Sequence, residues 1–173
     1  MTDEQFGAGV PDGWQRLWMP ERMAYLRGEG REGGCAFCRI ASMDDDAAAL
    51  IVARGQHVYV VLNLYPYNSG HVMVVPYRHV PSYLDLHADE TAELGEFTKS
   101  AMRTLTAASG AQGFNIGMNQ GSVAGAGIAE HLHQHIVPRW GGDANFMPII
   151  GRTKVLPQLL KDTREMLADA WPG

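Results

Sequence analysis

Residues 131–140 read HLHQHIVPRW, and this stretch decides how the rest of the chain is interpreted. His131, His133 and His135 follow one another at a spacing of two residues, in a chain that has seven histidines in all. Side chains two residues apart lie on one face of a β-strand, whereas a helix would point the same three side chains in different directions. Pro138 also disfavours a helix. The spacing therefore predicts a strand with a row of imidazoles on one face.

The imidazole row has three possible uses. The rings could have only a structural role, with their hydrogen bonds satisfied on a half-exposed sheet face. Alternatively, all three could bind one metal ion. The second use is disfavoured because three ligands on one strand are too collinear to surround a metal at about 2.0–2.1 Å. The third use is nucleophilic catalysis, since an imidazole with a pKa near ~6.5 is largely neutral at pH 7 and can attack phosphorus. The preceding loop GSVAGAGIA (121–129) offers backbone N–H groups without bulky side chains, which favours a phosphate substrate.

Composition limits the class of protein. The 173 residues are enough for one domain with a real core, and 46% of them are hydrophobic. The net charge of −5 disfavours a general nucleic-acid binder, which is usually basic. No apolar run approaches the roughly 18 residues that span a bilayer, and the N-terminus lacks a signal-peptide core. We therefore expect a cytoplasmic protein that binds neither nucleic acid nor membrane.

The order of elements predicts an α+β fold. An antiparallel sheet of about five strands is expected, with a long helix on one face and a helix at the C-terminus. Four strands can be placed from β-branched and aromatic residues and from flanking turns. The expected strands are 57–65, 71–77, 113–119 and 130–140, and the expected helices are 89–109 and 156–171. Residues 1–34 are interpreted as an N-terminal arm and linker, and residues 35–173 as the catalytic domain.

Several motifs together resemble one family. HLHQHIV (131–137) is similar to the signature of the histidine-triad (HIT) superfamily, with Gln134 at a usually apolar position. VLNLYPYNSGHVMVVPYRHV (61–80) resembles the paired strands of the Fhit-like branch, and MNQGSVAGAGIAEH (118–131) resembles its phosphate loop. HIVPRWGGDANF (135–146) is most similar to actinobacterial diadenosine tetraphosphate phosphorylases.

The resemblance implies roles for the three histidines. His133 would be the nucleophile on the α-phosphate and would form a nucleotidyl-imidazole intermediate. His135 would contact the phosphate and help the leaving oxygen to depart. His131 would support the geometry of the strand.

The resemblance also implies a substrate site. Asn63 would hydrogen-bond the ribose, and Asn119 would contact a phosphate or the leaving group. Gly127 stands where many relatives carry Gln, Ser or Thr, so only a backbone N–H would meet the phosphate there. Trp140 could belong to the core or could stack on the base. Basic residues that could attract polyphosphate are Arg139, Arg152 and Lys154, although each is more simply a solvated surface charge.

The reaction implied by the resemblance is cleavage of dinucleoside polyphosphates, with phosphate or water as acceptor and no organic cofactor. Phosphorolysis of diadenosine tetraphosphate to ADP and ATP is the first interpretation. A HIT-type hydrolase of dinucleotides or nucleoside phosphoramidates is the alternative, and a non-catalytic nucleotide-binding regulatory module is a third.

The two cysteines, Cys35 and Cys38, form a C-x-x-C motif, which in a reducing compartment indicates metal binding or redox chemistry. Some histidine-triad proteins bind structural zinc through such a pair, a histidine after the second sheet strand and the first triad histidine. His79 and His131 stand at the matching places, and two thiolates with two imidazoles suit tetrahedral zinc. A pair of reduced, unmetallated thiols is the competing interpretation.

The resemblance also implies a homodimer in which two sheets join, with the long helix at the seam. Small residues at Ala92, Gly95 and Ala101 would let a partner approach this helix closely. The aromatic arm, with Trp14, Trp18 and Tyr25, could extend the dimer to a tetramer.

Overall fold

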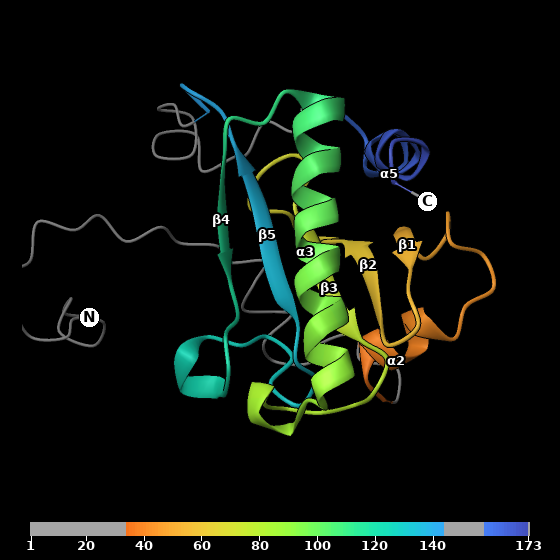
Figure 1. Cartoon of the computed structure of the whole chain (residues 1–173), viewed down its shortest axis with the longest axis vertical. Helices are drawn as coiled ribbons and strands as arrows, with labels where there is room; N and C mark the ends of the chain where they lie inside the picture. The colour runs from red at the N-terminus through yellow and green to blue at the C-terminus, as the bar shows by residue number, and fades with distance from the viewer. Residues whose placement is uncertain (1–33, 144–157, 173) are drawn as a thin grey trace, which may run out of the picture.

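A five-stranded antiparallel sheet with three helices forms the part of the chain that the structure describes, residues 34–143 and 158–172 of a computed structural model (Figure 1). The strand order is β1-β2-β3-β5-β4. The strands are β1 (Ile51–Arg54), β2 (Val58–Leu62), β3 (Val72–Pro76), β4 (Gly113–Gly117) and β5 (Gln134–Arg139). The helices are α2 (Ala36–Ala41), α3 (Ala88–Ser109) and α5 (Leu160–Asp169). This confirms the predicted α+β class, the long helix and the C-terminal helix.

The β2–β3 hairpin is the centre of the sheet, and all its strand residues are buried. Val58 pairs with Pro76 and Leu62 pairs with Val72, so the hairpin is in continuous register. Because successive side chains alternate, each strand contributes to two cores. The helix-side cluster contains Val58, Val60, Leu62, Val72, Val74, Leu94, Leu105 and Ile136. The histidine-side cluster contains Phe37, Ala49, Ile51, Tyr59, Val61, Met73 and Val75.

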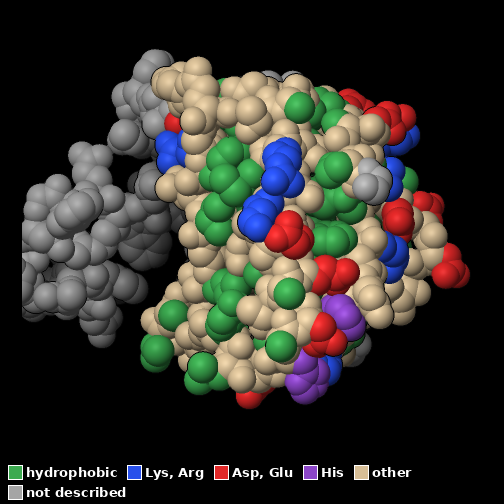
Figure 2. Space-filling model, viewed as in Figure 1, with side chains coloured by type: hydrophobic (Ala, Val, Ile, Leu, Met, Phe, Trp, Pro, Cys, Tyr) green, Lys and Arg blue, Asp and Glu red, His purple; other side chains and the backbone are tan. Residues whose placement is uncertain are grey.

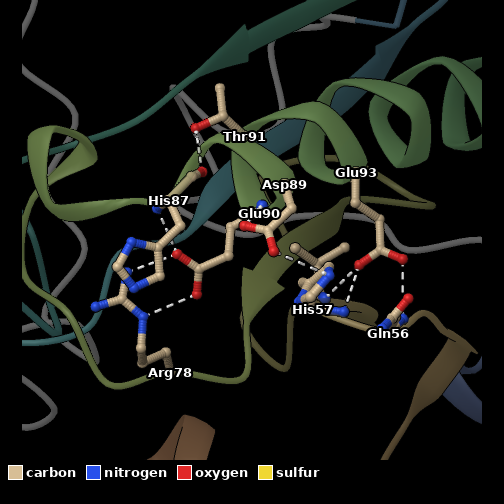
Figure 3. Close-up of polar contacts among 9 residues, drawn as sticks. Gln56, His57, Arg78, His87, Asp89, Glu90, Thr91 and Glu93 are labelled. Carbon is tan, nitrogen blue, oxygen red and sulfur yellow. Dashed lines mark hydrogen bonds and ion pairs between the residues drawn. The ribbon is translucent and has the colours of Figure 1, made fainter.

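Helix α3 lies across one face of the sheet, in contact with β2, β3 and β5 (Figure 1). Its buried residues include Leu94 and Leu105, which lie on an apolar stripe packed against the helix-side cluster. The helix ends as predicted at Gly110, whose φ of 66° favours a residue without a β-carbon. At its start, the carboxylate of Glu90 accepts the N–H of His87 at 2.7 Å (Figure 3).

Strand β5 begins later than predicted. The sequence predicts a strand over residues 130–140, but regular pairing starts at Gln134. Leu132 donates its N–H to the carbonyl of Val80 at 2.7 Å, beyond the end of β3. β5 then pairs with β3 on one side and with β4 on the other, with His135 opposite Met73 and opposite Gly117.

Strand β1 is the fifth strand, which the sequence did not locate. It is four residues long, follows the left-handed backbone of Leu50 (φ 58°), and has a bulge between Ile51 and Ala53. Residues 1–33 and 144–157, including the predicted arm, Arg152, Lys154 and the start of the predicted closing helix, lie outside the described residues. Among the described helices, none combines the length and apolar character needed to cross a membrane. Basic and acidic side chains are interspersed on the α3 face (Figure 2).

Candidate active site and metal cluster

The three triad histidines lie on the face of the sheet opposite α3. His131 and His133 pack against Phe37 of the histidine-side cluster, with ring centroids 5.5 and 4.9 Å from the phenyl ring. Gln134 points the other way and donates to Thr98 of α3 at 2.9 Å. The predicted alternation therefore holds, although only His135 of the three histidines lies within the regular strand.

His133 is held as a neutral ring with one defined tautomer. Its side chain is buried, and Nδ1 lies 2.8 Å from the carbonyl oxygen of His131. A carbonyl only accepts, so Nδ1 carries the proton and Nε2 carries the lone pair. Burial also lowers the pKa of His133, opposed in part by this hydrogen bond. The ring is therefore an uncharged nucleophile at neutral pH.

His135 is paired with a fourth histidine, His71, and the hydrogen bonds fix where the protons lie. The backbone N–H of Tyr67 donates to Nδ1 of His71 at 3.0 Å, so the proton of the neutral His71 ring is on Nε2. That Nε2 lies 2.9 Å from Nδ1 of His135 and donates to it. The neutral His135 ring consequently carries its own proton on Nε2. We call Tyr67 N–H, His71 and His135 the proton relay.

His71, which we interpret from the sequence as a strand-end or surface residue, directly precedes β3, but it is not a surface residue because its side chain is fully buried. A signal was present in the sequence: residues 71, 73 and 75 share one face of the predicted strand. Met73 pairs with His135, so His71 is the diagonal neighbour of His135 on the histidine face. The pairing register, which the sequence does not specify, was needed to see this.

Of the predicted substrate-binding residues, Asn63 has a contact with this centre. Asn63 follows β2, and its amide nitrogen is 3.4 Å from Nδ1 of His71. Asn119 and Gly127 flank the loop that contains the short 3-10 helix η3 (Ser122–Ala124). Within that loop Gly121 and Gly125 have φ of 79° and 81°, so glycine is required there for backbone reasons. Contacts of Asn63, Asn119 and Gly127 with a nucleotide stay predictions.

Trp140 and Arg139 have contacts of a structural kind. The indole of Trp140 packs against the helix-side cluster and donates to the carbonyl of Ser109 at 3.0 Å, as the core interpretation predicts. The guanidinium of Arg139 pairs with Asp143 and donates to Asn115 at 2.9 Å. The side chains of Trp140 and Arg139 therefore stabilise the end of β5.

Cys35, Cys38, His79 and His131 converge from three parts of the chain. Cys35 precedes α2, Cys38 lies in it, His79 follows β3, and one potential ligand atom of each residue lies within 4.8 Å of all the others. Nδ1 of His131 is 3.3 Å from the Cys35 sulfur and 3.2 Å from Nδ1 of His79. The Cys38 sulfur is 3.4 Å from Nδ1 of His79. This four-residue Cys2His2 cluster can bind a metal ion.

The distances and the tautomer both fit a tetrahedral ion. Ligands at Zn–S 2.3 Å and Zn–N 2.0–2.1 Å are separated from one another by roughly 3.3–3.8 Å, close to the spacings of the cluster. Nε2 of His131 lies 2.9 Å from the carbonyl of Pro76 and must donate to it, which leaves the lone pair on Nδ1, inside the cluster. The backbone carbonyl of His131 therefore contacts His133 in the active site, while the ring of His131 belongs to the Cys2His2 cluster.

Comparisons with known proteins agree with this geometry. Residues 45–142 match the family described as HIT domain. The chain is 53% identical to a protein of two strains of Mycobacterium tuberculosis named AP-4-A phosphorylase, over 95% of this chain and 88% of that protein. A crystal structure of a zinc-bound histidine triad family protein from Mycobacterium smegmatis superposes with a TM-score of 0.65 at 26% identity, covering 79% of this chain and 92% of that one. A hypothetical histidine triad nucleotide-binding protein from Sulfolobus tokodaii has a TM-score of 0.64 at 27% identity, covering 79% and 91%.

Proposed function

From the premise that this chain belongs to the HIT domain family, we propose that it is a nucleotidyl transferase that cleaves dinucleoside polyphosphates. Its main reaction is phosphorolysis of diadenosine tetraphosphate to ADP and ATP. The observation that carries the proposal is the hydrogen bond from His133 Nδ1 to the His131 carbonyl, which leaves a buried, neutral Nε2 as nucleophile. The likeness to the mycobacterial protein named AP-4-A phosphorylase supports the choice of substrate.

In the first step Nε2 of His133 attacks the α-phosphorus that is attached to one of the two adenosines. A P–N bond forms, the bond from phosphorus to the bridging oxygen breaks, and ATP departs. His135 holds a proton on Nε2 because its Nδ1 accepts from His71. This N–H group can donate a hydrogen bond to the departing phosphate oxygen and so stabilise the negative charge that develops there.

In the second step inorganic phosphate attacks the nucleotidyl-His133 intermediate from the position that ATP has left. A P–O bond forms, the P–N bond breaks, ADP is released and His133 regains its lone pair. Water in place of phosphate would give AMP, so a phosphorylase and a hydrolase differ only in the acceptor of this step.

Substrate contacts come from the residues around the histidines. Asn63 binds the ribose, Asn119 binds a phosphate or the leaving group, and the backbone of Gly127 donates to a phosphate oxygen. The half-buried position of Asn63, 3.4 Å from the His71 ring, supports a place for the ribose beside the proton relay. The proposed catalytic unit is residues 35–173.

Zinc is the metal proposed for the Cys2His2 cluster. Cys35, Cys38, His79 and His131 would hold it, and a closed set of two thiolates and two imidazoles supplies structural stability rather than an open coordination position. Both cysteines are free thiols, in keeping with a reducing cytoplasm. With metal bound, the segment around α2, including Phe37, is cross-linked to the start of the histidine motif.

The test is an incubation of the protein with diadenosine tetraphosphate, with and without inorganic phosphate, followed by separation of the nucleotides. Equal amounts of ADP and ATP that require phosphate support phosphorolysis. AMP and ATP formed at the same rate with or without phosphate would make the protein a hydrolase. Nucleotide binding without any product would leave the regulatory module as the function.

A further inference from the structure

The loop between β2 and β3, residues 63–71, is joined to the end of β5 by the side chain of Asn68. Its amide nitrogen donates to Asp143 Oδ2 at 2.9 Å and to the carbonyl of Pro138 at 3.1 Å. The backbone carbonyl of Asn68 accepts the N–H of His71 at 3.2 Å and closes the turn before β3. One side chain therefore connects two segments that lie 70 and 75 residues further along the chain.

Asp143 is a rigid acceptor for this link. Its carboxylate accepts from Nε and Nη2 of Arg139 at 2.6 and 2.8 Å and from the N–H of Trp140 at 3.1 Å. The side chain is 10% exposed. The Arg139 guanidinium, followed by the Trp140 N–H, holds the pKa of Asp143 well below its usual range, so the carboxylate stays ionised under all assay conditions near neutrality.

The link bears on the proton relay because Asn68 directly follows Tyr67. The Tyr67 N–H fixes the proton of His71 on Nε2, and that proton fixes the tautomer of His135. If the loop shifts and this N–H moves away, Nδ1 of His71 can take the proton instead. His71 Nε2 would then accept rather than donate, and the proton of His135 would move to Nδ1, away from the leaving group.

We propose that Asn68 and Asp143 are positioning residues that keep a proton on Nε2 of His135 for the leaving group. The inference rests on the proposed nucleotidyl transfer. The link acts on His135 and not on His133, because His133 is held by the His131 carbonyl and by Phe37. Loss of the link should therefore remove the hydrogen bond to the leaving group while the nucleophile stays in place.

The experiment compares two substrates that differ only in leaving group, the phenyl and the 4-nitrophenyl esters of AMP. Phenolate concentrates negative charge on its oxygen and depends on the hydrogen bond from His135, whereas 4-nitrophenolate delocalises this charge and departs without much assistance. The variants are Asn68→Ala and Asp143→Asn, with His71→Asn as a reference that removes the relay itself. For both variants kcat on the phenyl ester should fall about tenfold to a hundredfold. On the 4-nitrophenyl ester kcat should change little, and KM should stay similar for both substrates.

Glu93→Gln is the matched control. The Glu93 carboxylate accepts the N–H groups of Gln56 and Val58 at 2.8 and 2.9 Å, in the turn between β1 and β2 (Figure 3). Like Asp143→Asn, this change converts a carboxylate that accepts backbone N–H groups into an amide, so it costs stability by a similar mechanism. The control should lower the melting temperature and leave the ratio of the two ester rates at the wild-type value.

Equal losses on the two esters in Asn68→Ala and Asp143→Asn would overturn the inference, because a general loss of structure affects both substrates alike. A leaving-group dependence no greater than that of Glu93→Gln would overturn it as well. A wild-type protein that does not cleave diadenosine tetraphosphate would contradict the proposed function, and this inference with it.

Discussion

The carbonyl oxygen of His131 lies 2.8 Å from Nδ1 of His133, while the ring of His131 lies in the Cys2His2 cluster. One residue therefore contributes its side chain to the metal cluster and its backbone to the tautomer of the nucleophile. The second ring nitrogen of His131 donates to Pro76, so the ring has no further donor or acceptor for a substrate. This explains how three histidines in a row serve two different purposes.

Replacing the nucleophile should abolish turnover. In His133→Asn the side-chain amide can still donate to the His131 carbonyl, but no lone pair is available to attack phosphorus. We expect kcat to fall at least about a thousandfold. Affinity for a non-hydrolysable dinucleotide, measured by calorimetry, should stay within the wild-type range. A variant that keeps near-normal turnover would contradict the assignment of His133.

The row of histidines, the hairpin and the long helix were predictable because each rests on local patterns: two-residue alternation, β-branched runs and a glycine stop. β1 was not, because four residues beside a bulge carry too little periodicity. The role of His71 depends on the register of β3 against β5, which is a tertiary property.

The predicted position of Ala101 is wrong. It was expected at a dimer seam but is 1% exposed and packs inside the helix-side cluster, so it cannot receive a partner.

The purified protein should contain about one zinc ion per chain, with sulfur and nitrogen ligands. X-ray absorption and metal analysis would measure the ion and its ligands. Cys35→Ser combined with Cys38→Ser should lose the ion and lower the melting temperature. Ser42→Ala serves as a control, because Ser42 follows α2 and its hydroxyl donates only to the carbonyl of Arg39 among the described contacts. Absence of zinc from protein that was purified without any chelator would count against zinc binding by the Cys2His2 cluster.

The segment that carries His79 is anchored through its neighbour, Arg78. The guanidinium donates to both carboxylate oxygens of Glu90, at 2.9 and 2.6 Å (Figure 3). Arg78, opposed in part by burial, lowers the pKa of Glu90 to about 2, from an ordinary value of 4.5. A depressed carboxyl pKa stabilises the fold above pH 4.5, and this contribution is lost as the pH falls towards 2.

Glu90→Gln should therefore lower the melting temperature by several degrees at pH 7, and the difference from the wild type should shrink between pH 4.5 and pH 2. Glu96→Gln is the control, because the Glu96–Lys99 pair is exposed and contributes little. A difference between Glu90→Gln and the wild type that is the same at pH 7 and at pH 2.5 would show that the ionised carboxylate is not responsible.

We expect the protein to form a homodimer. Among the described strands, β4 lies at an edge of the sheet and pairs only with β5. Ile116 on this strand is 45% exposed, and Ala92 and Gly95 of α3 are at least partly exposed, so a two-fold partner could pair here. Light scattering at micromolar concentration should give twice the mass of one chain, and Ile116→Arg should shift the protein towards monomer. If the arm adds a tetramer, deletion of residues 1–27 should remove only that step. A monomer in the wild type would refute both assemblies.

The configuration at phosphorus tests the central claim, covalent transfer through His133, most directly. Diadenosine tetraphosphate with one sulfur on each α-phosphorus, as a single diastereomer, is cleaved in the presence of phosphate, and the α-thio ADP is analysed by phosphorus NMR. Two successive displacements, by His133 and then by phosphate, invert the centre twice, so the account predicts net retention. Inversion would show that phosphate attacks the substrate directly and would contradict the nucleotidyl-His133 intermediate.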